Sequence, residues 1–321
     1  MPDLPSLSGK VCLVTGASRG IGKGIALMLG KAGATVYVTG RTLQSATGKP
    51  GSLMETAQEV EYAGGKCIPV QCDHGKDEDV KQLFARIKRE QGGRLDVLVN
   101  NAYKGVQTIF ETYGKPFYEQ PISLWDDIND VGLRSSYVAS WFGAQMMVQA
   151  KQGLIVNISS PGGLVYFLNV PYGVGKAATD RMMADMSIEL RKNNVAAISL
   201  WPGPVSTEAI KDMLKSEKSS QMQRVFADSE DVTFTGKAVA WLAADPDIMK
   251  KSGSVQIVAE LAREYGFTDV GGVMPLSLRQ VKKLVQRAFP SLAWLVPEFL
   301  YIPAWLISAN THKFKPPSKL A

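Results

Sequence analysis

The sequence contains little histidine and cysteine, with only two and three residues of these types among 321. Two histidines, His74 and His312, are too few for a histidine-rich metal site, and they also argue against a histidine-based catalytic triad. The cysteines Cys12, Cys67 and Cys72 lie in or beside apolar runs and lack the spacing of metal ligands. We therefore expect buried, reduced thiols in a reducing compartment and no metal site.

The sequence also lacks a secretory signal and a long uninterrupted apolar run. The N-terminal residues have neither the basic nor the apolar region of a signal peptide, which predicts an intracellular protein. The most apolar part of the C-terminal tail, residues 292–307, is interrupted by Pro297, Glu298 and Pro303. It therefore does not contain the ~20 consecutive apolar residues of a membrane-spanning helix.

An excess of positive charge is absent from most of the chain. The net charge of +6 comes entirely from the residues after 270, where seven lysines and arginines accompany one glutamate. The remainder is neutral and has no basic run interleaved with aromatic residues, so we expect no nucleic-acid binding. Hydrophobic residues make up 45% and charged residues 21%, which is typical of one large globular domain, with or without an appendage.

Short apolar runs alternate with longer amphipathic stretches, the pattern of repeated β-α-β units. We predict strands at residues 10–15, 35–39, 66–72, 95–99, 153–158, 196–201 and 254–258. We predict helices at residues 20–32, 52–63, 76–91, 122–150, 172–193 and 234–244. The predicted fold class is α/β: a Rossmann-type, doubly wound parallel sheet of seven strands with helices on both faces, plus a C-terminal helical extension.

Two units are expected, a Rossmann-type catalytic domain over residues 8–265 and a basic, aromatic extension over residues 270–321. Segments 44–52, 108–121 and 208–231 interrupt the regular pattern, and the polar segment 208–231 is a candidate lid. Ligands of such a sheet bind beyond the carboxyl ends of the strands. The residues predicted at those ends are Gly16, Arg41, Asp73, Asn100, Ser160 and Pro202.

A glycine-rich turn, Thr-Gly-Ala-Ser-Arg-Gly-Ile-Gly at residues 15–22, connects the first predicted strand to the first helix. Gly16 lets the chain reverse, Gly20 lets backbone approach a ligand, and Gly22 lets the helix pack closely on the strand. The positive end of the helix dipole points at this turn, which favours a pyrophosphate. For this motif alone, a purely structural strand–helix turn is the alternative.

Tyr172 and Lys176 are four residues apart at the start of a predicted helix, so their side chains share one face. A phenol with a pKa of about 10 needs a nearby cation to act as an acid or base at neutral pH, and Lys176 supplies one. The strand predicted at 153–158 leads to Ser160, whose hydroxyl can hydrogen-bond a carbonyl oxygen of a substrate. The Tyr-x-x-x-Lys spacing alone is more often structural, but the order of these motifs favours a catalytic site.

These motifs, in this order, resemble those of the classical short-chain dehydrogenase/reductase family over roughly residues 8–260. The matching segments are TGASRGIG at 15–22, Asp73, NNA at 100–102, ISS at 158–160, YGVGK at 172–176 and PGPVST at 202–207. The resemblance implies an oxidoreductase that transfers a hydride between a nicotinamide cofactor and a small substrate.

The resemblance also implies a catalytic role for three residues: Ser160, Tyr172 and Lys176. Tyr172 is expected to protonate the carbonyl oxygen as the hydride reaches carbon. Lys176 is expected to lower the pKa of Tyr172 and to hold the nicotinamide ribose. Ser160, rather than Ser159, is expected to orient the carbonyl.

Cofactor contacts are implied in the same way. Asp73 is expected to accept a hydrogen bond from the adenine amine, while Val205 and Thr207 hold the nicotinamide carboxamide. Asn100 and Asn101 are expected to line the adenosine-ribose side and to tie the centre of the sheet. The full expected set comprises Gly16, Ser18, Arg19, Gly20, Ile21, Gly22, Arg41, Asp73, Asn100, Asn101, Tyr172, Lys176, Val205 and Thr207.

The second predicted strand lacks an acidic residue at its end, which bears on the choice of cofactor. An acid there would accept from the ribose 2′-hydroxyl of NAD and repel a 2′-phosphate. Instead Arg41 follows the strand and Arg19 lies in the glycine turn, where both can bind a 2′-phosphate. We therefore expect NADP(H) rather than NAD(H). Alternatively, Arg19 only covers the adenine and Arg41 is solvated.

Two residues depart from the family pattern. Gly132 stands where the family usually has an asparagine, whose side chain holds a water that links the lysine to solvent. Either an extra water fills this space, or Asn129 one turn earlier substitutes, or turnover is slow. Tyr103 replaces the glycine that usually follows Asn-Asn-Ala, and we expect it to narrow the cofactor cleft or to touch the substrate.

The tail predicts a basic amphipathic helix. Its apolar face comprises Leu278, Val281, Leu284, Val285, Ala288 and Phe289, and its cations are Arg279, Lys282, Lys283 and Arg287. Trp294, Tyr301 and Trp305 then suit a bilayer interface, and the family resemblance favours the endoplasmic reticulum membrane. In the alternative, the tail packs on its own domain or on a partner in a homo-oligomer, and the protein is cytoplasmic.

Together these features predict an NADP(H)-dependent enzyme that reduces a hydrophobic ketone or aldehyde, such as a steroid or a xenobiotic, to an alcohol. The alternative is a weakly active or inactive NADP(H)-binding sensor or scaffold at a membrane surface, which Gly132 suggests. Retention of the tyrosine, the lysine and the serine argues against it, because a binding protein has no use for the phenol.

Overall fold

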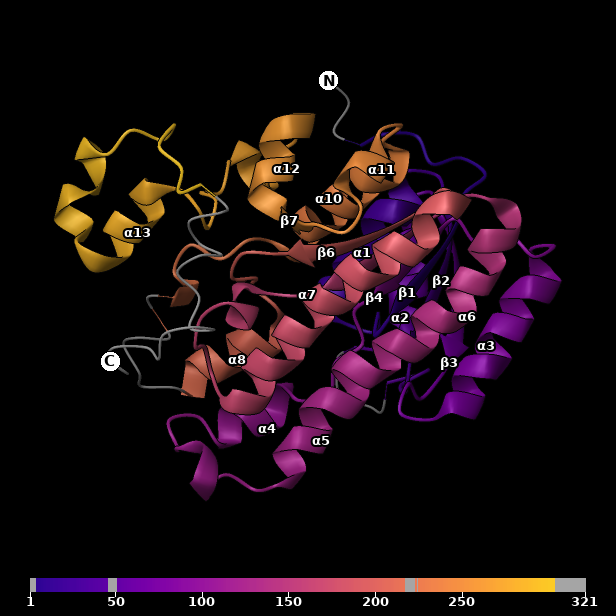
Figure 1. Ribbon diagram of the computed structural model, residues 1–321, viewed down its shortest axis with the longest axis horizontal. Coiled ribbons are helices and arrows are strands. Elements are labelled where there is room, and N and C mark those ends of the chain that lie inside the picture. Colours follow the sequence, from indigo (N-terminus) through magenta and orange to yellow (C-terminus); the bar gives the residue numbers. More distant parts are fainter. Residues whose placement is uncertain (1–3, 46–50, 217–222, 224, 304–321) are drawn as a thin grey trace.

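The chain folds around one parallel sheet of seven strands in the order β3-β2-β1-β4-β5-β6-β7 (Figure 1). The computed structural model describes residues 4–45, 51–216, 223 and 225–303. Its strands are β1 Val11–Thr15, β2 Thr35–Gly40, β3 Lys66–Gln71, β4 Val97–Asn100, β5 Gly153–Ile158, β6 Val195–Trp201 and β7 Val255–Ile257. The order reverses between β1 and β4, and this switch point is where doubly wound sheets bind ligands.

Helices cover both faces of the sheet, as predicted. On one face lie α1 Gly20–Lys31, α2 Leu53–Tyr62, α10 Val232–Ala244 and α12 Val258–Tyr265. On the other lie α3 Asp77–Glu90, α6 Ser135–Ala150 and α7 Val170–Leu190. Successive strand residues alternate between the two cores: Cys12 packs with the first layer of helices and Leu13 with the second. The three cysteines are free and buried, as expected.

The long central helix predicted over 122–150 is interrupted. It consists of α5 Ser123–Asn129 and α6, joined by a π-helical turn at Asp130–Arg134. Within this turn the backbone of Val131 (φ −108°, ψ 80°) and of Gly132 (φ 171°, ψ −52°) is not helical. The apolar periodicity runs on through the turn, so the prediction of one continuous helix is wrong.

Several short helices occupy segments for which we predicted none. They are α4 Val106–Glu111, α8 Glu208–Ser216, α11 Ile248–Lys251 and α12. The candidate lid at 208–231 therefore starts with a helix, and its residues 217–222 and 224 lie outside the described part of the chain. So do residues 46–50 of the loop after β2.

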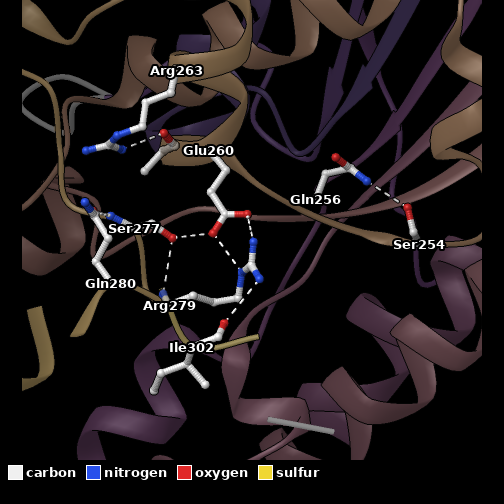
Figure 2. Close-up of polar contacts among 9 residues, drawn as sticks. Ser254, Gln256, Glu260, Arg263, Ser277, Arg279, Gln280 and Ile302 are labelled. Carbon is white, nitrogen blue, oxygen red and sulfur yellow. Dashed lines mark hydrogen bonds and ion pairs between the residues drawn. The ribbon is translucent and has the colours of Figure 1, made fainter. Parts of the chain in front are cut away.

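The C-terminal extension packs against α12 through a cluster of charged and polar side chains (Figure 2). Arg279 donates to both carboxylate oxygens of Glu260, through Nε at 2.8 Å and Nη2 at 2.6 Å. The hydroxyl of Ser277 donates to the same carboxylate at 2.6 Å, and Arg279 also donates to the backbone oxygen of Ile302 at 3.3 Å. The described part of the tail is therefore fastened to the catalytic domain.

The amphipathic helix predicted in the tail is present as α13 Val281–Ala288. It forms part of a unit at the edge of the molecule, beyond α12 (Figure 1). This unit exposes large apolar side chains, among them Trp294 and Phe299, each 78% exposed. Trp305 and the last three lysines lie outside the described residues.

Candidate active site

The glycine-rich turn after β1 is closed tightly against the end of β4. Gly16 has a φ of +66°, and a Cβ there would lie 2.6 Å from Cα of Ala102. A Cβ on Gly22 would lie 2.4 Å from the amide nitrogen of Asn101. That amide donates to the backbone oxygens of Thr15 and Gly16, both at 2.9 Å. Asn101 therefore fixes the shape of the turn, and the glycines are required by this close approach.

The N-terminus of α1 already binds an anionic group of this chain. The backbone N–H of Gly20, where φ is +58°, donates to Oε2 of Glu208 at 2.9 Å. Glu208 begins α8, 188 residues further along, and no sequence pattern indicated this contact. A carboxylate bound here shows that the turn offers its amide to an anion, as a pyrophosphate requires. The turn thus fits the pyrophosphate of a nicotinamide dinucleotide.

Two arginines lie where a 2′-phosphate would be recognised, and β2 ends without an acid. Arg41 directly follows β2, and Arg19 is the N-terminal cap residue of α1. Both side chains are exposed, and neither guanidinium forms an ion pair with a described residue. The stem of Arg19 packs close to Gly51, where a Cβ would lie 3.2 Å from Cβ of Arg19.

Asp73 and Asn100, also expected at the cofactor, form hydrogen bonds with other residues of the chain. Oδ1 of Asp73 accepts from the N–H of Gly75 at 3.0 Å, just beyond β3. The side chain of Asn100 is buried and donates to the hydroxyl of Ser140 in α6 at 2.9 Å. Asn100 therefore ties β4 to α6, and its amide faces the core rather than the open edge of the sheet.

The structure brings Ser160, Tyr172 and Lys176 together. The phenol of Tyr172 donates to Oγ of Ser160 at 2.8 Å. The ammonium of Lys176 donates to the backbone oxygen of Ile158 at 3.0 Å and lies 5.8 Å from the centre of the Tyr172 ring. Asn169 caps α7 by accepting from the N–H of Tyr172 at 2.9 Å, which places the tyrosine in the first turn of the helix.

Burial controls the ionisation of this cluster. It raises the pKa of Tyr172, and the hydrogen bond with Ser160 opposes this shift. Burial also lowers the pKa of Lys176 to about 8, against the attraction of Asp180. We expected Lys176 to lower the pKa of Tyr172, whereas in this structure desolvation is the largest influence on the phenol.

The loop after β6 carries Val205 and Thr207, and a buried glutamate that we did not predict clamps it. Glu230 pairs in a bridge with Val205, and its carboxylate accepts from the N–H of Gly203 at 2.9 Å. A Cβ on Gly203 would lie 2.3 Å from Oε1 of Glu230. Burial raises the pKa of Glu230 to about 7. A glutamate 27 residues from its partner in a polar segment gives no recognisable signal.

Tyr103 and Gly132, the two residues that depart from the family pattern, lie next to each other. The ring of Tyr103 lies edge-on to that of Tyr172, with centroids 6.4 Å apart, and the ammonium of Lys176 lies 5.2 Å from its centre. A Cβ on Gly132 would lie 2.9 Å from Cδ2 of Tyr103. A cavity of about 10 Å³ adjoins these residues and Asn129.

This fold and this cluster define a class of protein, and comparison with known families agrees. The family model described as short chain dehydrogenase matches residues 10–218. The chain belongs to the short-chain dehydrogenase/reductase family, whose members are oxidoreductases that bind nicotinamide cofactors and act on small substrates.

Within the family, Asn100–Tyr103, Trp125–Asn129, Ser159–Pro161 and the aromatic extension resemble Dehydrogenase/reductase SDR family member 1. The human protein of that name is 50% identical over 320 residues, covering 96% of this chain and 99% of the relative. The resemblance is confirmed over nearly the whole chain, extension included.

Solved structures show the same fold. A short-chain type dehydrogenase/reductase from Mycobacterium marinum has a TM-score of 0.68 at 26% identity, covering 79% of this chain and 96% of that one. A metagenomic short-chain oxidoreductase in complex with NADP has a TM-score of 0.62 at 28% identity, covering 78% of this chain and 96% of that one.

The described part of the chain contains neither a cluster of metal-binding side chains nor a helix able to span a membrane. Among residues 4–45, 51–216, 223 and 225–303, histidine, cysteine and carboxylate side chains form no group of three that could hold a metal ion. Across the same ranges, no helix has the length and apolar character that crossing a bilayer requires.

Proposed function

We propose that this protein is an NADP(H)-dependent carbonyl reductase that uses Tyr172 as its general acid. The observation that carries the proposal is the hydrogen bond of 2.8 Å from the Tyr172 phenol to Ser160, beside a buried Lys176. A phenol that donates at an open strand end, with a cation beside its ring, can transfer a proton to an oxygen held by the serine.

In this mechanism each residue has a defined task. The reduced nicotinamide, when bound, supplies the hydride that adds to the carbonyl carbon. Ser160 donates a hydrogen bond to the carbonyl oxygen, and Tyr172 gives that oxygen its proton. Lys176 holds the nicotinamide ribose, and its positive charge stabilises the phenolate left on Tyr172. The product is an alcohol, and the phenolate regains a proton before the next turnover.

The proposal of NADP(H) over NAD(H) rests on the end of β2. Arg41 and Arg19 are exposed cations at the same edge of the sheet, and no carboxylate ends that strand. Guanidinium groups bind a phosphate through paired, charge-assisted hydrogen bonds. The metagenomic relative with NADP shows that a fold of this kind accommodates the phosphorylated cofactor.

Apolar side chains around the phenol support a hydrophobic substrate, such as a steroid or a xenobiotic ketone or aldehyde. The ring centroids of Phe167 and Tyr172 lie 6.2 Å apart, and Leu168 and Tyr103 pack with Tyr172 in one apolar cluster. Val165 and Tyr166, each 53% exposed, extend this apolar surface outward.

The proposal is tested with a panel of hydrophobic ketones, aldehydes and quinones. Purified protein is mixed with NADPH or NADH, and the loss of nicotinamide absorbance is followed for each compound. We expect turnover of at least one compound and a preference for NADPH. An absence of turnover across the panel, with tight NADPH binding, would instead favour the sensor or scaffold.

Membrane attachment and self-association remain predictions. The basic helix α13 and the exposed Trp294 and Phe299 favour a bilayer surface, at the endoplasmic reticulum by family resemblance, while the contact of Arg279 with Glu260 favours the packed alternative. Vesicle flotation of the full chain distinguishes membrane attachment from packing of the tail on the domain.

For a homo-oligomer, the exposed Tyr137 and Trp141 on α6 provide a candidate surface, which sedimentation can test.

A further inference from the structure

Glu230 holds the loop after β6 with both its backbone and its side chain. Its N–H donates to the backbone oxygen of Pro204 at 2.7 Å, and its carbonyl oxygen accepts from the N–H of Ser206 at 2.9 Å. Oε2 of its carboxylate accepts from the N–H of Gly203 at 2.9 Å. These three contacts fix the loop immediately before Thr207.

The carboxylate fills the space that a side chain at residue 203 would need. A Cβ on Gly203 would lie 2.3 Å from Oε1 and 2.8 Å from Cδ of Glu230. Glu230 is only 2% exposed, and a carboxylate at this depth is costly unless other groups of the protein bind it. The fold therefore keeps an ionisable group where a neutral amide could accept the same hydrogen bond.

Two charged side chains from outside the lid segment act on this carboxylate. Burial is the largest influence on the pKa of Glu230 and raises it to about 7; the positive charge of Lys283 in α13 opposes the rise, and Asp269 adds to it. Asp269 follows α12, and its Oδ2 accepts from the N–H of Asp231 at 3.0 Å. Lys283 is therefore a cation of the C-terminal extension that favours the charged form of Glu230.

The contacts of the extension hold Lys283 in place. Its ammonium donates to the backbone oxygen of Leu276 at 2.9 Å. Gln286, one turn further along α13, donates to Oδ2 of Asp228 at 3.2 Å, just before Glu230 in the chain. The segment that precedes α13 is fastened to α12 by the charged and polar cluster shown in Figure 2. The helix is thus packed against the segment that carries the buried carboxylate.

We propose that Glu230 is a positioning residue for the nicotinamide, and that Lys283 of the extension controls it. When the carboxylate is charged, it holds the loop after β6 so that Val205 and Thr207 can bind the carboxamide. The inference rests on the proposed function. Neutral Glu230 is a weaker acceptor for the N–H of Gly203, because hydrogen bonds to ionised acceptors are the stronger ones. The extension therefore acts on the nicotinamide half of the cofactor through this one carboxylate.

The charged groups around Glu230 determine the direction of its pH dependence. Asp231 follows it and caps α10. Lys237 of α10 opposes the rise in pKa that burial causes in Asp269. Because burial and Asp269 disfavour the charged form of Glu230, removing Lys283 shifts the balance towards the neutral form. In the wild type the charged form predominates above a pH of about 7 and is lost as the pH falls through that value.

The first test compares two ligands by calorimetric titration of the full chain. One is NADPH, and the other is 2′-phospho-ADP-ribose, which is NADPH without its nicotinamide. Both carry the same phosphates and ribose, so the ratio of their affinities isolates the nicotinamide contact from the ionisation of those groups. In the wild type this ratio should increase as the pH rises through about 7.

Glu230→Gln keeps the shape and the acceptor oxygen but removes the charge. Above neutral pH it should lower the affinity ratio by about fivefold, the difference between a charged and a neutral hydrogen bond. The ratio should no longer change with pH, and the affinity for 2′-phospho-ADP-ribose should stay the same. A ratio equal to that of the wild type at every pH, or an equal loss for both ligands, would overturn the inference.

The second test removes the cation. In Lys283→Met the pH at which the affinity ratio increases should move upward, because Glu230 loses its neighbouring positive charge. Lys282→Met is the matched control: Lys282 pairs with Glu298 inside the extension, so the wild-type midpoint should be kept. Adding Lys283→Met to Glu230→Gln should change nothing further, because the lysine acts through the carboxylate. Independent effects of the two substitutions, or equal midpoints in both lysine variants, would contradict the proposal.

A third readout needs neither turnover nor cofactor. Hydrogen exchange of residues 203–207 in the full chain reports directly on the loop. At about pH 7.5 it should be faster in Glu230→Gln and in Lys283→Met than in the wild type, and unchanged in Lys282→Met. Equal exchange in all four proteins would refute the inference.

The outcomes separate this inference from the proposed function. If the wild type binds no nicotinamide cofactor, the proposed function fails and this inference fails with it. If the wild type binds NADPH and reduces a ketone, while the affinity ratio and the hydrogen exchange are the same in all variants, only the role of Glu230 and Lys283 is refuted.

Discussion

At the scale of single residues, burial shifts the pKa values of Lys176 and Tyr172 in opposite directions. Lys176 is surrounded by the rings of Tyr103 and Tyr172, and burial lowers its pKa to about 8. Tyr172 is shifted the opposite way, so it remains protonated at neutral pH. The phenol is then available as an acid, and the lysine is the group that titrates in the working range.

This ionisation predicts the pH dependence of reduction. The ammonium form of Lys176 dominates below a pH of about 8 and is lost as the pH rises through that value. Because reduction consumes a proton and needs the positive charge, kcat/KM should fall above that pH, by about tenfold per unit. Measuring kcat/KM between about pH 6 and 10, at constant ionic strength, tests whether this fall occurs. A flat profile to the upper limit would show that Lys176 keeps its proton.

The proposed preference for NADP(H) can be tested at Arg41, one of the two arginines on which it rests. Arg41→Asp replaces a cation by the acid that suits a ribose hydroxyl, so NADPH should bind more weakly and NADH more tightly. The relative affinity should move by about 2–3 kcal/mol, the value of one charge-assisted hydrogen bond. Titration of both cofactors by fluorescence measures it, with Arg181→Asp, an exposed arginine on α7, as control. An unchanged ratio would place Arg41 in solvent.

At the scale of elements, α8 connects the lid segment to the cofactor turn. Its first residue, Glu208, accepts from the N–H of Gly20, the amide that the turn offers to an anion. Thr207, immediately before the helix, accepts from the N–H of Ile210 at 3.3 Å. Under the proposed function a pyrophosphate binds at the N-terminus of α1, and Glu208 then has to release the N–H of Gly20.

Removing the negative charge of Glu208 should strengthen the binding of NADPH. An anion at a helix N-terminus contributes about 0.3–1 kcal/mol, so Glu208→Gln should bind NADPH roughly two- to fivefold more tightly. Asp212→Asn, an exposed carboxyl on the same helix that pairs with Lys215, is the matched control and should have no effect. Calorimetric titration compares the three proteins. Equal affinities would mean that Glu208 does not compete with the cofactor.

The elements also show what a sequence can predict. The seven strands were predictable because buried parallel strands are near-continuous apolar runs, and each observed strand overlaps its prediction. The break between α5 and α6 was not predictable, because the apolar pattern continues through Val131 and Gly132 while the backbone there is not helical. Ser160, Tyr172 and Lys176 were identifiable from motif order. The roles of Glu208 and Glu230 could not be identified from the sequence, since each contacts a residue far away in the chain.

At the scale of the whole molecule, the extension is joined to the catalytic domain by specific contacts. Arg279 and Ser277 share the carboxylate of Glu260 in α12, and Gln286 donates to Asp228, near the end of the lid segment, at 3.2 Å. These contacts connect the extension to α12 and, through Gln286 of α13, to the segment just before Glu230, whose carboxylate holds the loop after β6. The family motifs all lie upstream, but the described extension contributes to the fold.

Arg279→Ala should therefore destabilise the protein, because it leaves Glu260 half-buried without its guanidinium. We expect a loss of about 1–3 kcal/mol in the free energy of unfolding. Lys282→Ala breaks the ion pair with Glu298 inside the extension and should cost under about 1 kcal/mol. Urea unfolding measures all three proteins. Equal free energies of unfolding would show that the contact between Arg279 and Glu260 does not stabilise the fold.

The central claim is that Tyr172 supplies the proton in an NADPH-dependent reduction. Tyr172→Phe removes only the phenol oxygen that donates to Ser160 at 2.8 Å. Single-turnover reduction of a hydrophobic ketone by bound NADPH, with NADPH affinity measured on the same samples, tests the claim directly. We predict a loss of about 10²–10⁴-fold in the reduction rate, with the affinity nearly unchanged. A variant that reduces the ketone at close to the wild-type rate would contradict the account.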